Sequence, residues 1–351
     1  MDKKYWLSVG VLILLMVVSA CGKGGNTTGA PTSQFIGGFE GVSMAFEKDS
    51  PPPEVTDDGT FEFRAILKLR NEGEEDIDKN DLNARLIGFL PDDFGATPQE
   101  LGIISGFRAS GEGSIKIEEP VLYKKSRSPE GDIIEGGTTF VNIPKNNPFK
   151  IPAALNRDSA AFSGNTPFTF RAELCYKYHS TANARICVLR NLLDSSNDKV
   201  CEPRGSKPID SSGSPVQITN FRQAVLGRDS LTFTFDIVHR GVGEVYMYEE
   251  GKRAVCPRDD VSLKRMNRDK VYVKVSLSNA IGSTPECSFD DRQSDSGYVR
   301  LVDGLKRVTC KLNEIDTYRS DFESIVKIDA DFNYDQNIQT KVLVKHVPIS
   351  R

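Results

Sequence analysis

The chain of 351 residues contains seven cysteines, and their spacing sets one apart from the rest. Cys21 directly follows an uncharged run over residues 5–20, whereas the next cysteine is Cys175. The small residues Ser19 and Ala20 come just before it. A thiol can form a disulfide, bind a metal as a thiolate or carry a thioether-linked group. Cys21 therefore stands apart from the other six cysteines, at the end of an apolar amino-terminal run.

The first twenty residues have the pattern of an export signal. Two lysines precede an apolar run that is shorter than the roughly 18–20 residues an ordinary membrane-spanning helix needs. The tetrad Val18-Ser19-Ala20-Cys21 resembles the lipobox of prokaryotic membrane lipoproteins, with Val at the position usually held by Leu. This resemblance implies that residues 1–20 are removed as a signal peptide and that Cys21 carries lipid. The lipid would hold the protein at the extracytoplasmic face of the cell membrane. The alternatives are an ordinary signal peptide with an incidental cysteine and an uncleaved anchor helix.

Residues 21–33 have the composition of a flexible tether. Gly, Ser, Thr and Pro dominate this stretch, and such a coil would span about 20 Å. Asn26 begins an Asn-Thr-Thr sequon, which makes it a candidate for N-glycosylation. The folded part of the chain is therefore expected to begin near residue 34.

The other six cysteines are predicted to form three disulfides, because an even number in an exported protein is typical of a disulfide framework. Six cysteines allow 15 pairings. We expect sequence neighbours to pair, as 175–187, 201–256 and 287–310. The first pair has the most support, since "AELCYKYHSTANARICVLR" consists of two strand-like runs around a turn at Ser180–Asn183. The six residues are Cys175, Cys187, Cys201, Cys256, Cys287 and Cys310.

Metal binding is the rival interpretation of these cysteines. The sequence has no Cys-x-x-Cys spacing. It has only three histidines, none paired at ligand spacing: His179, His239 and His346. We therefore expect no metal site and no cofactor.

Asp329, Asp331, Asn333 and Asp335 are spaced like the start of an EF-hand calcium loop. Such a loop needs Gly at its sixth position and Glu at its twelfth, where this chain has Tyr and Val. Apolar residues alternate with the acidic ones, which favours a strand with one apolar face. Weak calcium binding at the surface is the alternative.

Two further acidic runs favour solvated loops, again with calcium binding as the alternative. The sequence contains no Gly-x-Ser-x-Gly elbow, and each histidine is expected at the surface or at a strand edge, His179 in the hairpin turn. It therefore identifies no catalytic residue, although the carboxylate pair of a glycosidase would be close only in space. The acidic residues are Glu72, Glu74, Glu75, Asp76, Asp78 and Asp81 in the first run and Asp290, Asp291 and Asp295 in the second.

From Phe35 onward, apolar residues recur with a period of two, which predicts β-strands. Residues 61–69 alternate apolar and mostly charged side chains, and residues 231–237 repeat the pattern. No long amphipathic helix competes, although a short helical turn is expected near residues 97–102 or 191–195. The net charge of −4 argues against nucleic acid as a partner.

The length exceeds what a single core usually supports, so we expect two domains, residues 34–200 and 216–349, joined by a linker over residues 201–215. Residues 35–75 and 215–245 share a layout of a first strand, a break and an alternating strand that ends near a Gly. This layout resembles the immunoglobulin-like modules of prokaryotic, particularly archaeal, cell-surface proteins, although the tryptophan of true immunoglobulin domains is missing. The expected fold is all-β, with two antiparallel immunoglobulin-like β-sandwich domains.

These features predict a lipid-anchored cell-surface protein that binds an envelope protein or glycan, or takes part in envelope assembly, and not an enzyme. The alternative is a β-sandwich hydrolase that acts on envelope or extracellular glycans. Flat faces and an unpaired edge strand would favour binding. A deep pocket with two converging carboxylates, or a histidine with an acidic partner, would favour the enzyme. A third possibility is strand exchange with a neighbour through residues 340–347.

Overall fold

The computed structural model describes residues 33–103, 120–152, 162, 164–193, 200–278, 283–315 and 320–347. The chain divides into Met1–Gln34 and a compact unit, Phe35–Arg351. The predicted signal peptide, the tether up to residue 32, Cys21 and Asn26 all lie outside the described residues. In the described part, no helix is long and apolar enough to cross a membrane.

The predicted all-β class is confirmed, because β-strands make up most of the regular structure. The one α-helix of the described part is α2 (Val261–Asn267). Three short 3₁₀ helices accompany it: η1 (Lys79–Asp81), η2 (Pro91–Phe94) and η3 (Gln99–Leu101). The last of these lies within the helical turn predicted at residues 97–102. The immunoglobulin-like topology stays a prediction.

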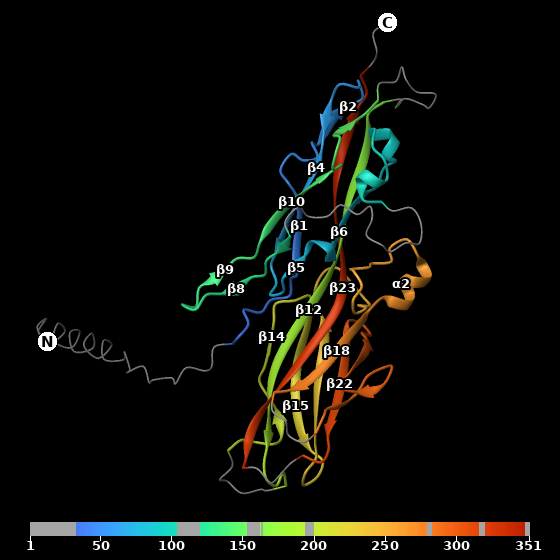
Figure 1. The fold of residues 1–351 in the computed structure, drawn as a ribbon. Coiled ribbons are helices and arrows are strands. Elements are labelled where there is room, and N and C mark those ends of the chain that lie inside the picture. Colours follow the sequence, from blue (N-terminus) through green and yellow to red (C-terminus); the bar gives the residue numbers. More distant parts are fainter. Residues whose placement is uncertain are drawn as a thin grey trace, which may run out of the picture. The chain divides into compact units, whose positions relative to one another are not determined.

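Two long strands form the centre of the compact unit. β12 (Thr166–Val188) and β23 (Phe322–Lys345) pair antiparallel from Thr166↔Val344 to Val188↔Phe322, and Figure 1 draws them side by side. Shorter strands extend this eight-stranded sheet on both sides. β12 pairs with β6 (Leu82–Ile87) and β14 (Ile209–Ser211). β23 pairs with β2 (Glu54–Thr56), β17 (Glu244–Tyr246) and β18 (Lys270–Leu277), and β21 (Ser296–Arg300) follows β18.

A six-stranded antiparallel sheet lies against the second half of β12. Gln223 of this sheet accepts a hydrogen bond from the backbone N–H of Cys187 (2.9 Å) and donates one to its carbonyl (2.8 Å). The alternating strand predicted at residues 231–237 is confirmed, since Phe233, Phe235 and Ile237 are fully buried. The strands, in sheet order, are β13 (Gly205–Ser206), β15 (Val216–Val225), β16 (Leu231–His239), β22 (Leu305–Leu312), β19 (Glu286–Ser288) and β20 (Gln293–Ser294).

A three-stranded sheet lies beside the other half of the long strands. Its order is β1 (Val42–Phe46), β4 (Ala65–Asn71) and β10 (Thr138–Ile143). Three two-stranded pairs complete the fold: β3 (Glu62–Phe63) with β11 (Phe149–Lys150), β5 (Ile77–Asp78) with β7 (Val121–Leu122), and β8 (Ser126–Arg127) with β9 (Ile133–Ile134). The core here contains four phenylalanines whose ring centroids lie 5.1–6.2 Å apart: Phe63, Phe94, Phe149 and Phe170.

The two segments that the sequence assigned to separate sandwiches share the central sheet. β12 comes from the predicted first domain and β23 from the predicted second, yet they pair along their whole length. Residues from Phe35 onward accordingly cluster as one compact unit. The predicted linker, residues 201–215, contains β13 and β14.

The three disulfides are Cys175–Cys256, Cys187–Cys201 and Cys287–Cys310. The last was predicted correctly, whereas the predicted pairs 175–187 and 201–256 are wrong. The predicted turn at Ser180–Asn183 does not exist, because β12 runs straight through it. Two residues twelve positions apart on one strand are separated by about 40 Å, far beyond the reach of a disulfide.

Candidate binding face

The eight-stranded sheet has one buried face and one partly solvent-exposed face along β12. Tyr178, Ser180 and Ala182 are buried, whereas His179 and Thr181, which alternate with them, are partly exposed. This period of two follows from strand geometry, in which successive side chains point to opposite faces. His179 therefore lies within a strand and not in the hairpin turn that the sequence predicted.

Polar side chains of β12 and β23 meet on this face because His179 lies opposite Asp331 and Thr181 lies opposite Asp329. Nδ1 of His179 lies 2.8 Å from a carboxylate oxygen of Asp331. Nε2 lies 3.1 Å from Asp329 and 3.0 Å from the hydroxyl of Thr181, which itself donates to Asp329 (2.9 Å). Nζ of Lys327 adds an ion pair with Asp329 at 2.9 Å. Each ring nitrogen of His179 therefore has a carboxylate partner.

These contacts fix the charge of His179. Burial alone would lower its pKa, but the hydrogen bonds to Asp329 and Asp331 outweigh burial and raise the pKa to about 10. Burial would raise the pKa of Asp329, and the hydrogen bonds from His179 and Lys327 instead lower it to about 2. At neutral pH, His179 is therefore an imidazolium that donates from both nitrogens, and Asp329 is a carboxylate.

Three tyrosines continue the row across the sheet. Tyr272 of β18 lies opposite Asp331 and also opposite Tyr298 of β21. The rings of Tyr272 and Tyr298 are 5.1 Å apart and inclined by 62°. The hydroxyl of Tyr298 donates to the carbonyl of Tyr248 (2.8 Å), and Nζ of Lys177 lies 4.7 Å from the centre of the Tyr248 ring. Aromatic rings and fixed charges thus lie side by side, most of them on the sheet and Tyr248 on the segment that follows β17.

Two carboxylates from the first acidic run border this row. Burial raises the pKa of Glu75, although the charge of His179 acts in the opposite direction. Burial also raises the pKa of Asp81, against the charge of Lys177. Partly desolvated groups with shifted pKa values often mark functional sites. We call the following nine residues the candidate binding face: Glu75, Asp81, Lys177, His179, Tyr248, Tyr272, Tyr298, Asp329 and Asp331.

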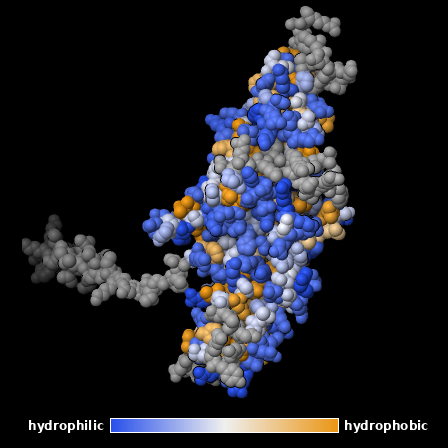
Figure 2. All heavy atoms as spheres, viewed as in Figure 1, coloured by the Kyte–Doolittle hydropathy of each residue, from blue (hydrophilic) through white to orange (hydrophobic). Residues whose placement is uncertain are grey.

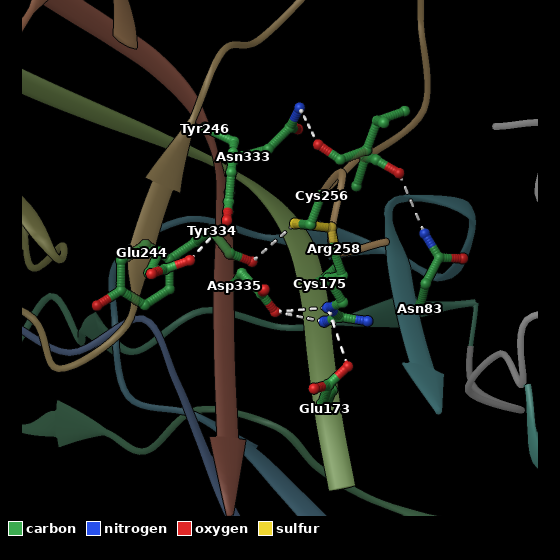
Figure 3. Close-up of a disulfide and its surroundings, with 12 residues drawn as sticks. Asn83, Glu173, Cys175, Glu244, Tyr246, Cys256, Arg258, Asn333, Tyr334 and Asp335 are labelled. Carbon is green, nitrogen blue, oxygen red and sulfur yellow. Dashed lines mark hydrogen bonds and ion pairs between the residues drawn. A yellow bond between two sulfur atoms is a disulfide. The ribbon is translucent and has the colours of Figure 1, made fainter. Parts of the chain in front are cut away.

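A crossing segment, residues 247–260, positions Tyr248 over the sheet. The Cys175–Cys256 disulfide fastens it to β12, as Figure 3 shows. The amide of Asn333 on β23 donates to the carbonyl of Met247 (2.8 Å), and the amide of Asn83 on β6 donates to that of Ala254 (3.3 Å). The segment is therefore held to three strands of the sheet by covalent and polar contacts.

A buried ion network lies beside the disulfide (Figure 3). Nε of Arg258 donates to Asp335 (2.9 Å) and lies 3.5 Å from Glu173. Arg85 also contacts Glu173 (2.6 Å) and extends the network to Asp259 (2.6 Å). Burial raises the pKa of Asp335, although Arg258 opposes this effect. Loss of a buried member such as Arg258 would leave Asp335 without its ion-pair partner, which is costly, whereas Asp259 is exposed.

Each of the three histidines has a polar partner in the fold. Both nitrogens of His179 are engaged, so it has no free nitrogen to act as a general base. His239 contacts the hydroxyl of Tyr334 (3.2 Å), and burial lowers its pKa. His346 contacts Asp57 (2.8 Å) near the carboxyl end of the described chain. Among the described residues, no three His, Cys, Asp or Glu side chains are arranged to hold a metal ion.

The EF-hand-like run lies on β23, as the strand interpretation predicted. Alternate residues of a strand are about 6.6 Å apart, so their carboxylates form a row and do not converge on one ion. Each member has its own partner: His179 for Asp329 and Asp331, Met247 for Asn333, and Arg258 for Asp335.

Some carboxylates of the two acidic runs form hydrogen bonds within the fold, whereas the sequence favoured solvated loops. The carboxylate of Glu74 accepts the backbone N–H groups of Ile36 (2.9 Å), Gly37 (2.9 Å) and Gly213 (2.6 Å). Asp290 accepts the N–H of Arg300 at 2.6 Å. These carboxylates fasten loops to neighbouring segments instead of being only solvated.

Sequence reasoning missed the three tyrosines. In "VYVKV" and "SGYVR", Tyr272 and Tyr298 alternate with buried valines, which places them on the more polar face. That alternation was the available signal. Tyr248 gave none, because it lies in an irregular segment held by a distant disulfide.

No family model matches the chain, and no curated protein is significantly similar to it.

Proposed function

We propose that the chain is an exported, lipid-anchored protein that binds glycan of the cell envelope through the candidate binding face. Three disulfides among the described residues support folding in an oxidising compartment. The signal pattern and Cys21 support export and anchoring.

The observation that carries the proposal is the row His179, Asp331, Tyr272 and Tyr298 across three pairs of neighbouring strands. A sugar offers hydroxyl groups, which both donate and accept hydrogen bonds, and apolar C–H faces. The carboxylates accept, Lys177 donates, and tyrosine rings offer apolar surface with a polar tip, while His179 holds two of the carboxylates in place. Lys177, His179, Tyr272, Tyr298 and Asp331 lie on strands of one sheet, which holds them more firmly than a loop would.

The test is titration of the full chain with soluble polysaccharide from the envelope of its own cell. Replacing Tyr272 by Ala removes a ring from the centre of the row. We expect affinity to fall about tenfold, which corresponds to about 1.4 kcal/mol. Tyr123→Ala is the matched control, since Tyr123 is 63% exposed and is not part of the face. Equal affinity for the two variants would refute the proposed site.

One observation favours the second candidate function, a glycan hydrolase. Burial raises the pKa of Glu75, and the charge of Asp331 acts on it in the same direction. Glycosidases use a pair of carboxyl groups, one of which has a raised pKa and acts as the general acid. If this function holds, Glu75→Gln abolishes release of reducing sugar ends. If the wild-type chain releases no sugar, the binding proposal stands alone.

A further inference from the structure

The outer edge of β10 has no strand partner among the described residues. β10 is the last strand of the order β1-β4-β10. The opposite edge of that sheet is covered, because Val42 of β1 donates its N–H to the hydroxyl of Tyr176 (3.1 Å) and accepts from the amide of Gln336 (2.6 Å). The two edges of one small sheet therefore differ, and only the β10 edge is open in the described part.

The register of β4 shows which backbone groups of β10 point outward. The carbonyl of Ile66 accepts from Glu47 on the β1 side, whereas the N–H of Asn71 donates to Gly137 on the β10 side. Backbone groups alternate along a strand, so Leu67 and Leu69 face β10. Their partners Val141 and Thr139 therefore bond to β4. The N–H and C=O groups left pointing away from β4 belong to Thr138, Phe140 and Asn142.

This edge lacks the features by which proteins usually block strand addition. β10 reads TTFVNI and contains no charge and no proline, and its pairing with β4 has no bulge. Other edge strands carry charges, such as Glu54 in β2, Asp210 in β14 and Arg300 in β21. An uncharged, regular edge with free backbone groups is a template for another strand.

We propose that β10 pairs antiparallel with β10 of a second copy of this chain, about a two-fold axis at Phe140. In this register, Phe140 faces Phe140 of the other copy, and Thr138 faces Asn142 of the other copy on both sides of the axis. All three outward residues are then paired, which gives about six backbone hydrogen bonds. A shift by one residue would direct the free backbone groups away from each other.

Charge complementarity favours a second copy over an unrelated peptide. Glu135 and Lys145 lie equally far from Phe140 in the sequence, one before β10 and one after it. A two-fold axis at Phe140 brings Glu135 of one copy towards Lys145 of the other, twice. The Glu135 side chain is 58% exposed although it contacts Arg70 and Lys125, and no described acid forms an ion pair with Lys145. The contact is thus reciprocal, as a two-fold interface requires.

Exposed apolar residues near the edge support the same partner. Phe140 is 48% exposed at the centre of the proposed contact. Hydrophobic residues are also visible on the β8–β9 hairpin in Figure 2, where Ile133 and Ile134 are 49% and 53% exposed. A single six-residue strand pair buries little area, so the dimer is expected to be weak and to depend on local concentration.

Disulfide trapping in membranes tests the proposal and its register. The full chain carries Phe140→Cys, Thr138→Cys or Asn142→Cys, and mild oxidant is added before a non-reducing gel. We expect Phe140→Cys to form a covalent dimer, because facing Cα atoms of a strand pair are about 5.5 Å apart. Thr138→Cys and Asn142→Cys should each stay monomeric alone and cross-link when coexpressed.

The wild-type chain under the same oxidant controls for Cys21 and the native disulfides. Sedimentation of the detergent-solubilised chain gives a second readout, in which Phe140→Lys is expected to abolish the dimer. Leu226→Lys, at a residue 53% exposed elsewhere, should not. The proposal is overturned if Phe140→Cys forms no dimer, if Thr138→Cys cross-links alone, or if the trapped partner is a different protein or another segment of the same chain.

Discussion

Replacing His179 by Gln should remove a pH dependence of stability that the geometry of the face imposes. The imidazolium of His179 donates to Asp331 and Asp329, which raises its pKa from 6.5 to about 10. The pKa is higher in the folded than in the unfolded chain. The stabilisation is therefore complete below pH 6.5 and is lost as the pH rises towards 10. Gln is neutral throughout, so the Gln variant lacks this dependence.

The size of the effect follows from proton linkage. One pKa unit corresponds to about 1.4 kcal/mol. With pKa values of 6.5 and about 10, protonation of His179 contributes about 4 kcal/mol at pH 7 and about 1 kcal/mol at pH 9. The difference in unfolding free energy between the wild type and His179→Gln should therefore shrink by about 2–3 kcal/mol from pH 7 to pH 9.

Urea unfolding followed by circular dichroism at the two pH values provides the assay. His239→Gln is the control. Burial lowers the pKa of His239, so its contribution to the unfolding free energy changes with pH mainly below pH 6.5. Its difference from the wild type should stay constant between pH 7 and pH 9. A constant difference for His179→Gln as well would mean that His179 is not held as a cation, and the description of the face would be wrong.

Three further predictions concern the lipid anchor and the contacts that stabilise the fold. Cys21→Ala should leave the signal attached and abolish the lipid-modified mass in the membrane fraction, and an unchanged mass would contradict the lipid anchor. Replacing both Cys175 and Cys256 by Ser should lower the unfolding free energy by about 4–5 kcal/mol, because this disulfide closes a loop with a sequence separation of 81. Thermal unfolding would measure the loss. Glu74→Gln weakens three charge-assisted hydrogen bonds to the backbone and should lower the unfolding free energy by about 1–3 kcal/mol. Urea unfolding measures this loss, and a change below about 0.5 kcal/mol would refute the role of Glu74 in holding these loops.

The alternation of apolar residues predicted the strands well where it was regular. β16 buries Phe233, Phe235 and Ile237 as the period of two requires. Pairing of sequence neighbours was correct for Cys287 and Cys310, which lie opposite each other on β19 and β22, and wrong for the other four cysteines. The alternation of β16 was enough because it shows which face of a strand is buried, whichever strands pair with it.

The long strands could not be predicted in the same way. The turn signal at Ser180–Asn183 lacks Gly and Pro, and the same residues fit a continuous strand once β23 supplies a partner along its length. His179 and Asp331 are 152 residues apart, so only the register of β12 on β23 brings them together. The candidate binding face depends on this register, which no local pattern contains.

Hydrogen–deuterium exchange of the full chain, with and without soluble envelope polysaccharide, tests the proposed function most directly. The account predicts slower exchange in peptides that cover residues 177–181, 270–274 and 296–300, with little change in those that cover residues 216–225. Protection confined to other segments, or no protection at saturating polysaccharide, would contradict the assignment of this face as the binding site.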